Sequence, residues 1–313
     1  MKGNSADFDV LVVGAGPAGL SVAMWCAELG LTSVVLEREA AGGGQMQSIY
    51  NPITNYLGSP ARNGAELADR FLETFGQFNV PIEFGAGAVD VNVEGRSVAA
   101  SNGKRYAGRF LVLATGVSRR RLNLPGENLF EQKGILVSGA RDRREVAGKI
   151  VAVIGGGDAA LENALMLSEF ASHVYVIHRR TEFSARPSFV AKAAEDPRIE
   201  FIFGSSVASI DGDKRVESIT VCIGPAGKTA LMAVDFVLIR IGVEPNTDFL
   251  EGQVDLDPYG YVLVDSLCRT SAAGVSAVGD VANPIAPTIA TAAGTGATAA
   301  KHIRFLLNSN TAL

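Results

Sequence analysis

Two glycine clusters, each preceded by an apolar run, are the residues of this sequence best suited to chemistry on a ligand. The first is Gly14-Ala15-Gly16-Pro17-Ala18-Gly19, and the second is Gly155-Gly156-Gly157-Asp158-Ala159-Ala160, 141 positions further along. In the spacing G-x-G-x-x-G/A, the first glycine allows a tight turn, the second lets the backbone approach a pyrophosphate, and the third lets a helix pack closely on its strand. We therefore predict two dinucleotide sites, each at a helix N-terminus with unpaired N–H groups.

The first cluster lies between two predicted buried strands, residues 9–13 and 33–36. The second of these strands ends at Glu37, 18 residues after Gly19. A carboxylate there can accept hydrogen bonds from ribose hydroxyls and would repel a 2′-phosphate. The first site is therefore expected to take an adenine dinucleotide with a free ribose, such as FAD or NAD.

The second cluster differs at the corresponding strand end. Its strand, residues 173–177, is followed by His178-Arg179-Arg180 instead of an acid. Guanidinium groups bind phosphate through paired N–H donors. We therefore expect NADP(H) at this site in preference to NAD(H), the alternative being that the two arginines only solvate the strand end.

Two further segments are expected to reach the first site. The glycine-rich loop of residues 40–58 is long, and long ordered loops beside a cofactor usually touch it. Residues 274–280 read as a strand ending at Asp280, which can accept hydrogen bonds from a sugar-alcohol chain. A helix of small residues then begins near Thr288 and Ile289, where N–H groups can face a developing negative charge.

Composition limits the classes of protein to consider. The chain has 313 residues, is 47% hydrophobic, and carries a net charge of −5. These values predict a globular protein of two domains without a nucleic-acid surface. Residues 1–7 are not an apolar signal segment and no apolar run is long enough for a membrane span, so we expect a cytoplasmic protein. The three cysteines form no C-x-x-C pair and the three histidines are scattered, so structural thiols and no metal site are expected.

Taken together, these motifs resemble the two-dinucleotide-domain flavoprotein reductases, and among them the low-molecular-weight thioredoxin reductase group, over nearly the whole chain. The resemblance rests on the two glycine clusters, Gly43-Gly44-Gln45, Asn55, Ala114-Thr115-Gly116, His178-Arg179-Arg180, Gly242 with Pro245-Asn246-Thr247, and Ala277-Val278-Gly279-Asp280.

The resemblance implies an α/β fold with two Rossmann-like dinucleotide-binding domains, each with a small antiparallel β meander. The FAD-binding domain is expected over residues 1–117 and 246–313, with an NAD(P)H-binding domain over 118–245 inserted in it. Asn55 matches the family's asparagine beside the flavin ring, and a homodimer is the usual state of the family.

The site residues expected from the motifs and the resemblance form two groups. Those expected at FAD are Gly14, Gly16, Pro17, Ala18, Gly19, Glu37, Arg38, Gly44, Gln45, Asn55, Ala114, Thr115, Gly116, Gly279, Asp280, Thr288 and Ile289. Those expected at NAD(P)H are Gly155, Gly157, Asp158, Ala159, His178, Arg179, Arg180, Arg186, Ile241 and Gly242.

Two departures from the family pattern shape the functional prediction. In the family, the redox dithiol lies just before the strand that leads into the second glycine cluster, but residues 136–145 contain no cysteine. The arginine usually found after Phe183 is Ser184, and Arg186 could stand in for it. The chain therefore looks closer to a dithiol-free branch, the thioredoxin-reductase-like ferredoxin or flavodoxin NADP reductases.

The predicted function is that of an FAD-dependent NAD(P)H oxidoreductase without a catalytic cysteine pair. Hydride would pass from NADPH to FAD, and electrons would then pass to a protein carrier such as ferredoxin or flavodoxin. The alternatives are a flavin reductase or oxidase, a small-molecule reductase, or a flavin-binding protein that has no catalytic activity.

Overall fold

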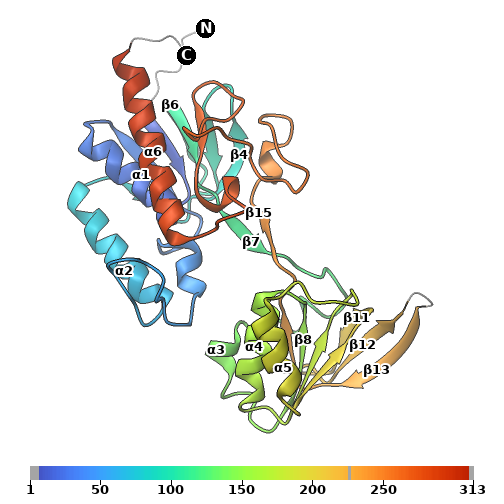
Figure 1. Ribbon diagram of the computed structural model, residues 1–313. Helices are drawn as coiled ribbons and strands as arrows, with labels where there is room; N and C mark the ends of the chain where they lie inside the picture. The colour runs from blue at the N-terminus through green and yellow to red at the C-terminus, as the bar shows by residue number, and fades with distance from the viewer. Residues whose placement is uncertain (1–6, 225–226, 310–313) are drawn as a thin grey trace. The chain divides into compact units, whose positions relative to one another are not determined.

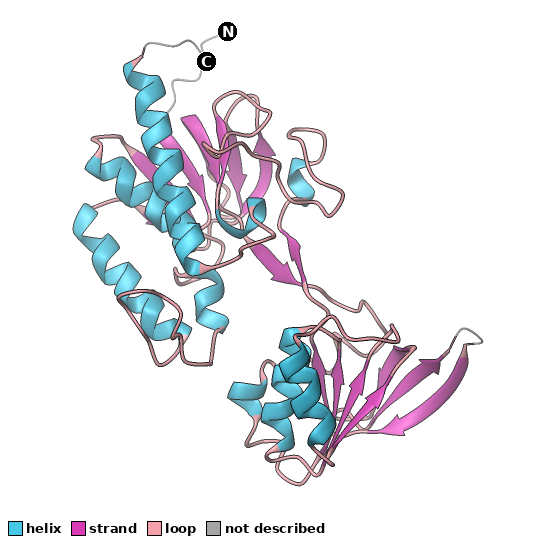
Figure 2. Cartoon of the chain, in the orientation of Figure 1, coloured by secondary structure: helices cyan, strands magenta, loops and turns pink. Residues whose placement is uncertain are grey.

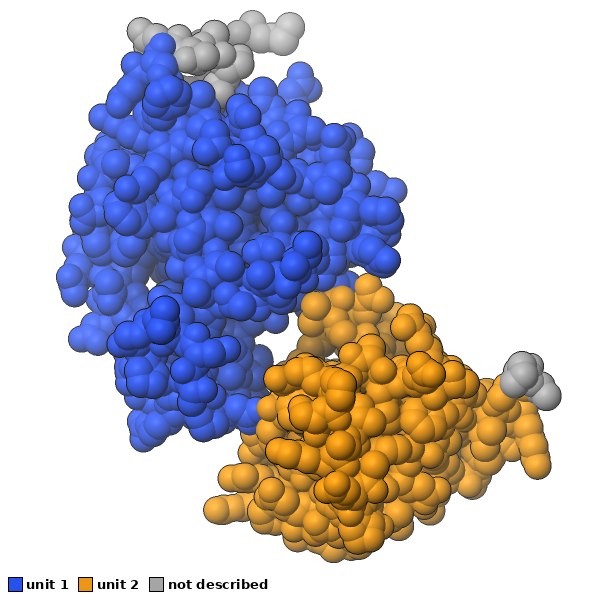
Figure 3. Space-filling view, in the orientation of Figure 1, with its two compact units in different colours: residues 1–118, 244–313 blue, residues 119–243 orange. Residues whose placement is uncertain are grey.

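The computed structural model describes residues 7–224 and 227–309 of the chain. The chain divides into two compact units, which Figure 3 shows in different colours. Unit 1 combines the residues up to Ser118 with those from Glu244 onward, and unit 2 is the inserted segment Arg119–Val243.

Unit 1 is built on a parallel sheet whose strands end at one edge. Strand β1 (Phe8–Val13) lies between β2 (Ser33–Leu36) and β6 (Arg105–Leu113), and β16 (Val275–Ala277) pairs with the other side of β6. The register aligns Val13 with both Leu36 and Leu113, and Ala277 with Leu113. The four strands therefore deliver the residues that follow them to the same edge of the sheet, where ligands bind in such folds.

Further elements complete unit 1. Strand β3 (Ile82–Glu83) pairs with β2, while β4 (Ala88–Asn92) and β5 (Ser97–Ala100) continue from β6 as an antiparallel meander. The short strands β7 (Val117–Arg119) and β15 (Val243–Pro245) form a two-stranded sheet where the chain passes between the units. The short helices are η1 (Gly44–Ser48), η2 (Gly76–Phe78), η3 (Asp248–Leu250) and η4 (Gly279–Ala282).

Helices α1 (Pro17–Glu28) and α6 (Ile289–Asn308) pack together against this sheet (Figure 1). They approach closely because small residues line the contact: a Cβ added to Gly296 would lie 2.5 Å from the Ala18 carbonyl oxygen. The Ser21 hydroxyl also donates a 2.7 Å hydrogen bond to the Ala293 carbonyl. Helix α2 (Gly64–Phe75) begins at Asn63, whose side chain caps the Glu66 N–H.

Unit 2 repeats this plan on a smaller scale. Its parallel sheet has the order β10 (Ile199–Ile202), β9 (His173–Ile177), β8 (Ile150–Ile154) and β14 (Phe236–Ile239). Helices α3 (Gly139–Asp142), α4 (Asp158–Ser168) and α5 (Pro187–Glu195) lie to one side, as Figure 2 shows in cyan. The antiparallel meander of β11 (Ser205–Asp211), β12 (Ser218–Ile223) and β13 (Lys228–Ala233) packs on the other side.

The predicted fold class, α/β with two Rossmann-like units that each carry a small meander, is confirmed. Among the described residues, no helix is long and apolar enough to cross a membrane. The cytoplasmic location and the homodimer remain predictions.

Candidate functional site

The first glycine turn follows β1 directly. Gly14 has a φ of 107°, and a Cβ there would lie 2.4 Å from the Ala114 carbonyl oxygen, so only glycine fits. A Cβ on Gly19 would lie 1.9 Å from the Gly14 carbonyl oxygen, which explains the close packing of α1 on its strand. Gly16, the N-cap residue of α1, has open space at its Cβ position. The turn is therefore closed toward the protein and open where a pyrophosphate would approach.

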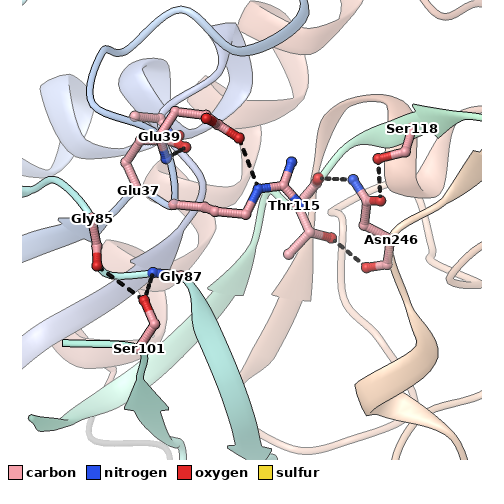
Figure 4. Close-up of polar contacts among 10 residues, drawn as sticks. Glu37, Glu39, Gly85, Gly87, Ser101, Thr115, Ser118 and Asn246 are labelled. Atoms are coloured by element: carbon pink, nitrogen blue, oxygen red, sulfur yellow. Dashed lines mark hydrogen bonds and ion pairs between the residues drawn. The ribbon is translucent and has the colours of Figure 1, made fainter. Parts of the chain in front are cut away.

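Glu37 braces this turn from the end of β2. Its carboxylate accepts a 2.8 Å hydrogen bond from the Glu39 backbone N–H (Figure 4) and another of 2.8 Å from the Ala15 backbone N–H. The residue is only 7% exposed. Each oxygen keeps a second lone pair that a ribose hydroxyl could use. Sequence reasoning predicted the ribose contact and missed the brace, which depends on where the chain turns after β2.

The neighbouring Arg38 points into solvent. Its Nε lies 3.0 Å from Oε1 of Glu39, and both side chains are exposed. The structure thus places Arg38 beside the turn, with its charge paired.

The glycine-rich loop after β2 folds back onto the same turn. The Gly43 N–H donates a 2.8 Å hydrogen bond to the Ala15 carbonyl, and a Cβ on Gly44 would lie 3.0 Å from the Cα of Gly16. Gln45 then reaches Asp280, with 2.9 Å between its Nε2 and Oδ2 of Asp280. Burial raises the pKa of the Asp280 carboxyl, and the hydrogen bond from Gln45 acts in the opposite direction.

Gly279 and the start of α6 complete this group. A Cβ on Gly279 would lie 2.8 Å from the Cβ of Ala18, which brings the end of β16 against α1. Thr288 is the N-cap residue of α6, and its hydroxyl accepts the Thr291 N–H at 3.1 Å. The N–H of Ile289 is one of the first-turn donors that has no partner within its own helix.

Hydrogen bonds connect the residues that follow β6 to Asn246, which lies just after the chain leaves unit 2. The Asn246 side chain donates to the Thr115 carbonyl at 2.7 Å and accepts from the Ser118 hydroxyl at 2.7 Å (Figure 4). The Thr115 hydroxyl donates to the Asn246 carbonyl, and the Asn246 N–H donates to the Gly116 carbonyl. These contacts hold residues 114–116 firmly beside the first turn.

Asn55 is the exception among the residues predicted at FAD. It lies in an exposed loop closed by an isolated bridge between Ile53 and Ala61. Within the described residues, no hydrogen bond connects Asn55 to the glycine turn.

The second glycine turn in unit 2 has the same construction. Gly155 has a φ of 144°, and its N–H donates to the Ile177 carbonyl at 3.0 Å. Gly157 caps α4 and has only the Ser184 hydroxyl near its Cβ position, at 3.9 Å. Ala160 is fully buried where the first turn has its third glycine. Asp158 and Ala159 open the helix, so this turn also presents a helix N-terminus.

Beyond β9, the two predicted phosphate-binding arginines are exposed and unpaired. Arg179 and Arg180 line an open hollow of about 500 Å³ together with residues 181–184. In the part of the chain that the structure describes, no carboxylate lies within ion-pair distance of either guanidinium. Two free guanidinium groups at the end of this strand fit a 2′-phosphate.

His178 supports the turn instead of facing the hollow. A Cβ on Gly156 would lie 2.3 Å from the His178 ring, whose Nε2 lies 3.1 Å from the Glu182 carbonyl oxygen. Burial lowers the pKa of His178, and the charges of Arg180 and Arg179 lower it further. The neutral ring therefore serves as packing beneath the glycine turn.

Arg186 forms an ion pair with Asp158. Its Nε lies 2.8 Å from Oδ2 of Asp158, and its backbone N–H donates to Oδ1 at 2.7 Å. Arg186, the N-cap residue of α5, thus contacts the first residue of α4 beside the second glycine turn.

Ile241 and Gly242 follow β14 at the exit from unit 2. Gly242 has a φ of 94°, and its carbonyl accepts the Arg120 N–H at 3.1 Å. Ile241 packs against the core under the meander.

The segment before β8, where the family resemblance places a dithiol, is held by polar residues that sequence reasoning missed. The buried Asp142 accepts the Val137 N–H at 2.6 Å and the Ser138 N–H at 2.9 Å. The Val137 carbonyl accepts from Arg240 at 2.6 Å and from Arg119 at 2.7 Å. Burial lowers the pKa of Arg240 to about 10. The only sequence signal was an acidic residue within a basic run.

The cysteines lie elsewhere, and two of the three are unsuited to thiol chemistry. Cys26 and Cys268 are buried in the core around α1 and α6, and burial raises their pKa values to about 12 and about 11. Thiols of this kind stay protonated at neutral pH and are poor nucleophiles. Cys222 is partly buried on β12.

Two parallel-sheet units, each with a glycine turn at a helix N-terminus, define a two-domain dinucleotide-dependent oxidoreductase. The chain belongs to the pyridine nucleotide-disulphide oxidoreductase family, whose sequence pattern matches residues 8–296. It is a flavin-dependent pyridine nucleotide oxidoreductase of the thioredoxin reductase type, and FAD and NADPH are the cofactors of this group. The prediction of FAD with NADPH is confirmed.

Individual relatives support this placement. The chain is 33% identical to a thioredoxin reductase of Streptomyces coelicolor over 297 residues, which cover 93% of this chain and 91% of that protein. It is 34% identical to a thioredoxin reductase of Chlamydia trachomatis over 310 residues, which cover 96% and 98%. The crystal structure of Lactococcus lactis thioredoxin reductase matches with a TM-score of 0.84 at 29% identity, covering 97% of this chain and 100% of that one.

These findings correct the functional prediction. Ferredoxin or flavodoxin as the electron acceptor is wrong, because the similar proteins and structures are named thioredoxin reductase. The alternatives of a flavin reductase or oxidase, a small-molecule reductase or a non-catalytic flavin-binding protein are not favoured either. The absence of cysteine from one short segment shows which chemistry that segment lacks, and it does not identify the electron acceptor.

Proposed function

We propose that this chain transfers hydride from NADPH to FAD and then reduces a disulphide of a thioredoxin-type protein. Unit 1 would hold FAD and unit 2 would hold NADPH. We propose the corresponding domain bounds as residues 1–117 with 246–313 for FAD and residues 118–245 for NADPH. The observation that carries this proposal is the contrast between the two strand ends: a buried carboxylate follows β2, and two unpaired guanidinium groups follow β9.

The residues of unit 1 fit FAD. The open face at Gly16 and the free N–H groups of α1 suit a pyrophosphate, and Glu37 suits the ribose. Asp280, held by Gln45, is a half-buried carboxylate that can accept hydrogen bonds from the ribityl chain. The α6 N-terminus near Thr288 and Ile289 would stabilise negative charge on the flavin ring.

The residues of unit 2 fit NADPH. Gly155 and Gly157 shape the turn for the pyrophosphate, and Arg179 and Arg180 would bind the 2′-phosphate. Bound FAD supplies a two-electron acceptor for the hydride. The part of the protein is then to orient the nicotinamide and to exclude water, so no acid–base side chain is required.

The proposed acceptor follows from the family and from the cysteines. The relatives reduce thioredoxin by name, yet residues 136–145 of this chain contain no cysteine. We propose that the partner's own disulphide takes the two electrons directly, and with two protons it becomes two thiols. The proposal thus makes this chain a thioredoxin reductase-like protein without the redox dithiol, and not a ferredoxin or flavodoxin reductase.

An anaerobic titration tests both steps. NADPH should bleach the flavin absorbance at much lower concentration than NADH, and oxidised thioredoxin should then restore the absorbance and yield two thiols per flavin. Failure of the second step alone would contradict the acceptor, whereas failure of the first would contradict the whole proposal.

A cysteine-pair variant gives a matched comparison. Ser138 is the N-cap residue of α3 and Arg141 lies in its first turn, so Ser138→Cys with Arg141→Cys creates a C-x-x-C at a helix N-terminus. The native chain should reduce thioredoxin without the pair, and Ser138→Ala with Arg141→Ala should behave like the native chain. Activity only in the cysteine variant would show that the native chain does not reduce thioredoxin.

A further inference from the structure

The first residue of α4 is an acid in a place where an anion is expected to bind. Asp158 directly follows Gly157 in the second glycine turn. A helix N-terminus attracts negative charge, so the Asp158 carboxylate and an incoming pyrophosphate compete for the same field. An uncompensated charge at Asp158 would also repel phosphates that bind at this helix N-terminus.

Arg186 compensates this charge with two contacts. Its Nε donates to Oδ2 of Asp158 at 2.8 Å, and its backbone N–H donates to Oδ1 at 2.7 Å. The guanidinium carbon also lies 4.4 Å from the centroid of the Phe189 ring, which limits where the side chain can go.

The chain between the arginines and this pair is anchored to the glycine turn. The Ser184 N–H donates to the Gly156 carbonyl at 2.9 Å, and the His178 ring lies against Gly156. The position of Arg186 is therefore set by the same turn whose charge it balances.

The pair contributes little to folding. The side chains of Arg186 and Asp158 are 65% and 45% exposed, and exposed ion pairs have small effects on stability. The main effect of the ion pair is on the local charge at the second glycine turn.

We propose that Arg186 is a positioning residue that neutralises Asp158 and so keeps the second glycine turn receptive to the pyrophosphate of the nicotinamide cofactor. This rests on the proposed function. Arg186 then acts on the part that NADPH and NADH share, whereas Arg179 and Arg180 act on the 2′-phosphate that only NADPH carries.

The test measures equilibrium binding of NADP⁺ and NAD⁺ to the FAD-loaded protein by calorimetry. Arg186→Ala should weaken both ligands by a similar factor, about fivefold at low salt, because an unbalanced charge is left beside the phosphates. The factor should shrink as ionic strength rises. In turnover, KM should rise while kcat stays within about twofold, as expected when only binding is affected.

Removing both charges separates this role from a purely structural one. Asp158→Asn combined with Arg186→Ala should restore binding to within about twofold of the native protein, because no charge is left to balance. Arg186→Lys should retain most of the affinity.

A matched control is present in the same unit. Arg198 contacts Asp196 through its backbone N–H at 3.0 Å and its guanidinium at 2.9 Å, away from the glycine turn. Arg198→Ala should leave both dissociation constants unchanged.

Two results would overturn the proposal. A loss confined to NADP⁺ would place Arg186 at the 2′-phosphate, and a double variant as weak as Arg186→Ala would rule out charge balance. Failure of the proposed function is seen separately, as failure of the native protein to bind either nucleotide or to reduce its flavin.

Discussion

Gln45 and Asp280, 235 positions apart in the chain, are joined by a 2.9 Å hydrogen bond from the amide of Gln45 to Oδ2 of Asp280. Gln45 lies in η1, within the loop that folds back onto the first glycine turn, and Asp280 follows β16 at the same sheet edge. Burial raises the pKa of Asp280 and so disfavours the charged carboxylate, whereas the hydrogen bond from Gln45 favours it. A carboxylate kept at such a position is expected where a ligand needs a strong hydrogen-bond acceptor.

Asp280→Asn is therefore expected to separate stability from FAD binding. A carboxyl whose pKa is raised on folding contributes stability below its usual pKa of 3.8, and this contribution is lost as the pH rises through the raised value. The flavin-free variant should thus be more stable than the native protein at pH 7.5, with little difference at pH 3.5, when thermal unfolding is compared. Its FAD content after reconstitution should fall. Greater stability of the variant without a loss of FAD content would show that Asp280 does not bind the flavin cofactor.

Glu37 and Glu39 offer a matched pair of acids. Glu37→Gln removes an acceptor from one of two backbone N–H groups, the buried one of Ala15 or the partly buried one of Glu39, so the free energy of unfolding should fall by about 1–3 kcal/mol. Glu39→Gln breaks only an exposed ion pair with Arg38 and should change it by less than about 0.5 kcal/mol. Urea unfolding of both variants measures the difference. Equal effects would mean that Glu37 does not brace the turn.

Arg179 and Arg180 are expected to select NADPH over NADH. Replacing both with alanine should raise the KM for NADPH at least about tenfold, since charge-assisted bonds to the 2′-phosphate are lost, and should leave the KM for NADH nearly unchanged. Lys192→Ala, at another exposed cation of unit 2, is the control. Steady-state flavin turnover with each nucleotide gives the ratio, and equal changes would contradict the assignment.

The protein is expected to lose stability in mild acid because of two of its histidines. The pKa values of His178 and His302 are lowered, in both cases mainly by burial. A histidine with a lowered pKa contributes stability that is complete above its usual value of 6.5 and is lost as the pH falls below it. The free energy of unfolding should therefore decrease from pH 7 to pH 5, and His178→Gln with His302→Gln should flatten this slope. An unchanged slope would assign the pH dependence to other groups.

The acceptor shows where sequence reasoning failed. The absence of a cysteine near Ser138 is a fact of the sequence, but it says which residue is missing and not which partner the protein uses. Similarity over nearly the whole chain to proteins named thioredoxin reductase carries more information about the partner. The structure shows that the backbone of this segment is well anchored. Asp142, Arg119 and Arg240 all form hydrogen bonds with the backbone of Val137.

The sequence by itself determined the two glycine turns, the strands around them and the difference between Glu37 and Arg179. These are local features, since glycine spacing and the residue at a strand end act within a few positions of the chain. Only the tertiary structure decided which polar groups meet: Gln45 with Asp280, and Arg186 with Asp158. Such pairs form because strands and loops distant in sequence converge at one edge of a sheet, and that convergence depends on the register of the whole sheet and not on any one segment.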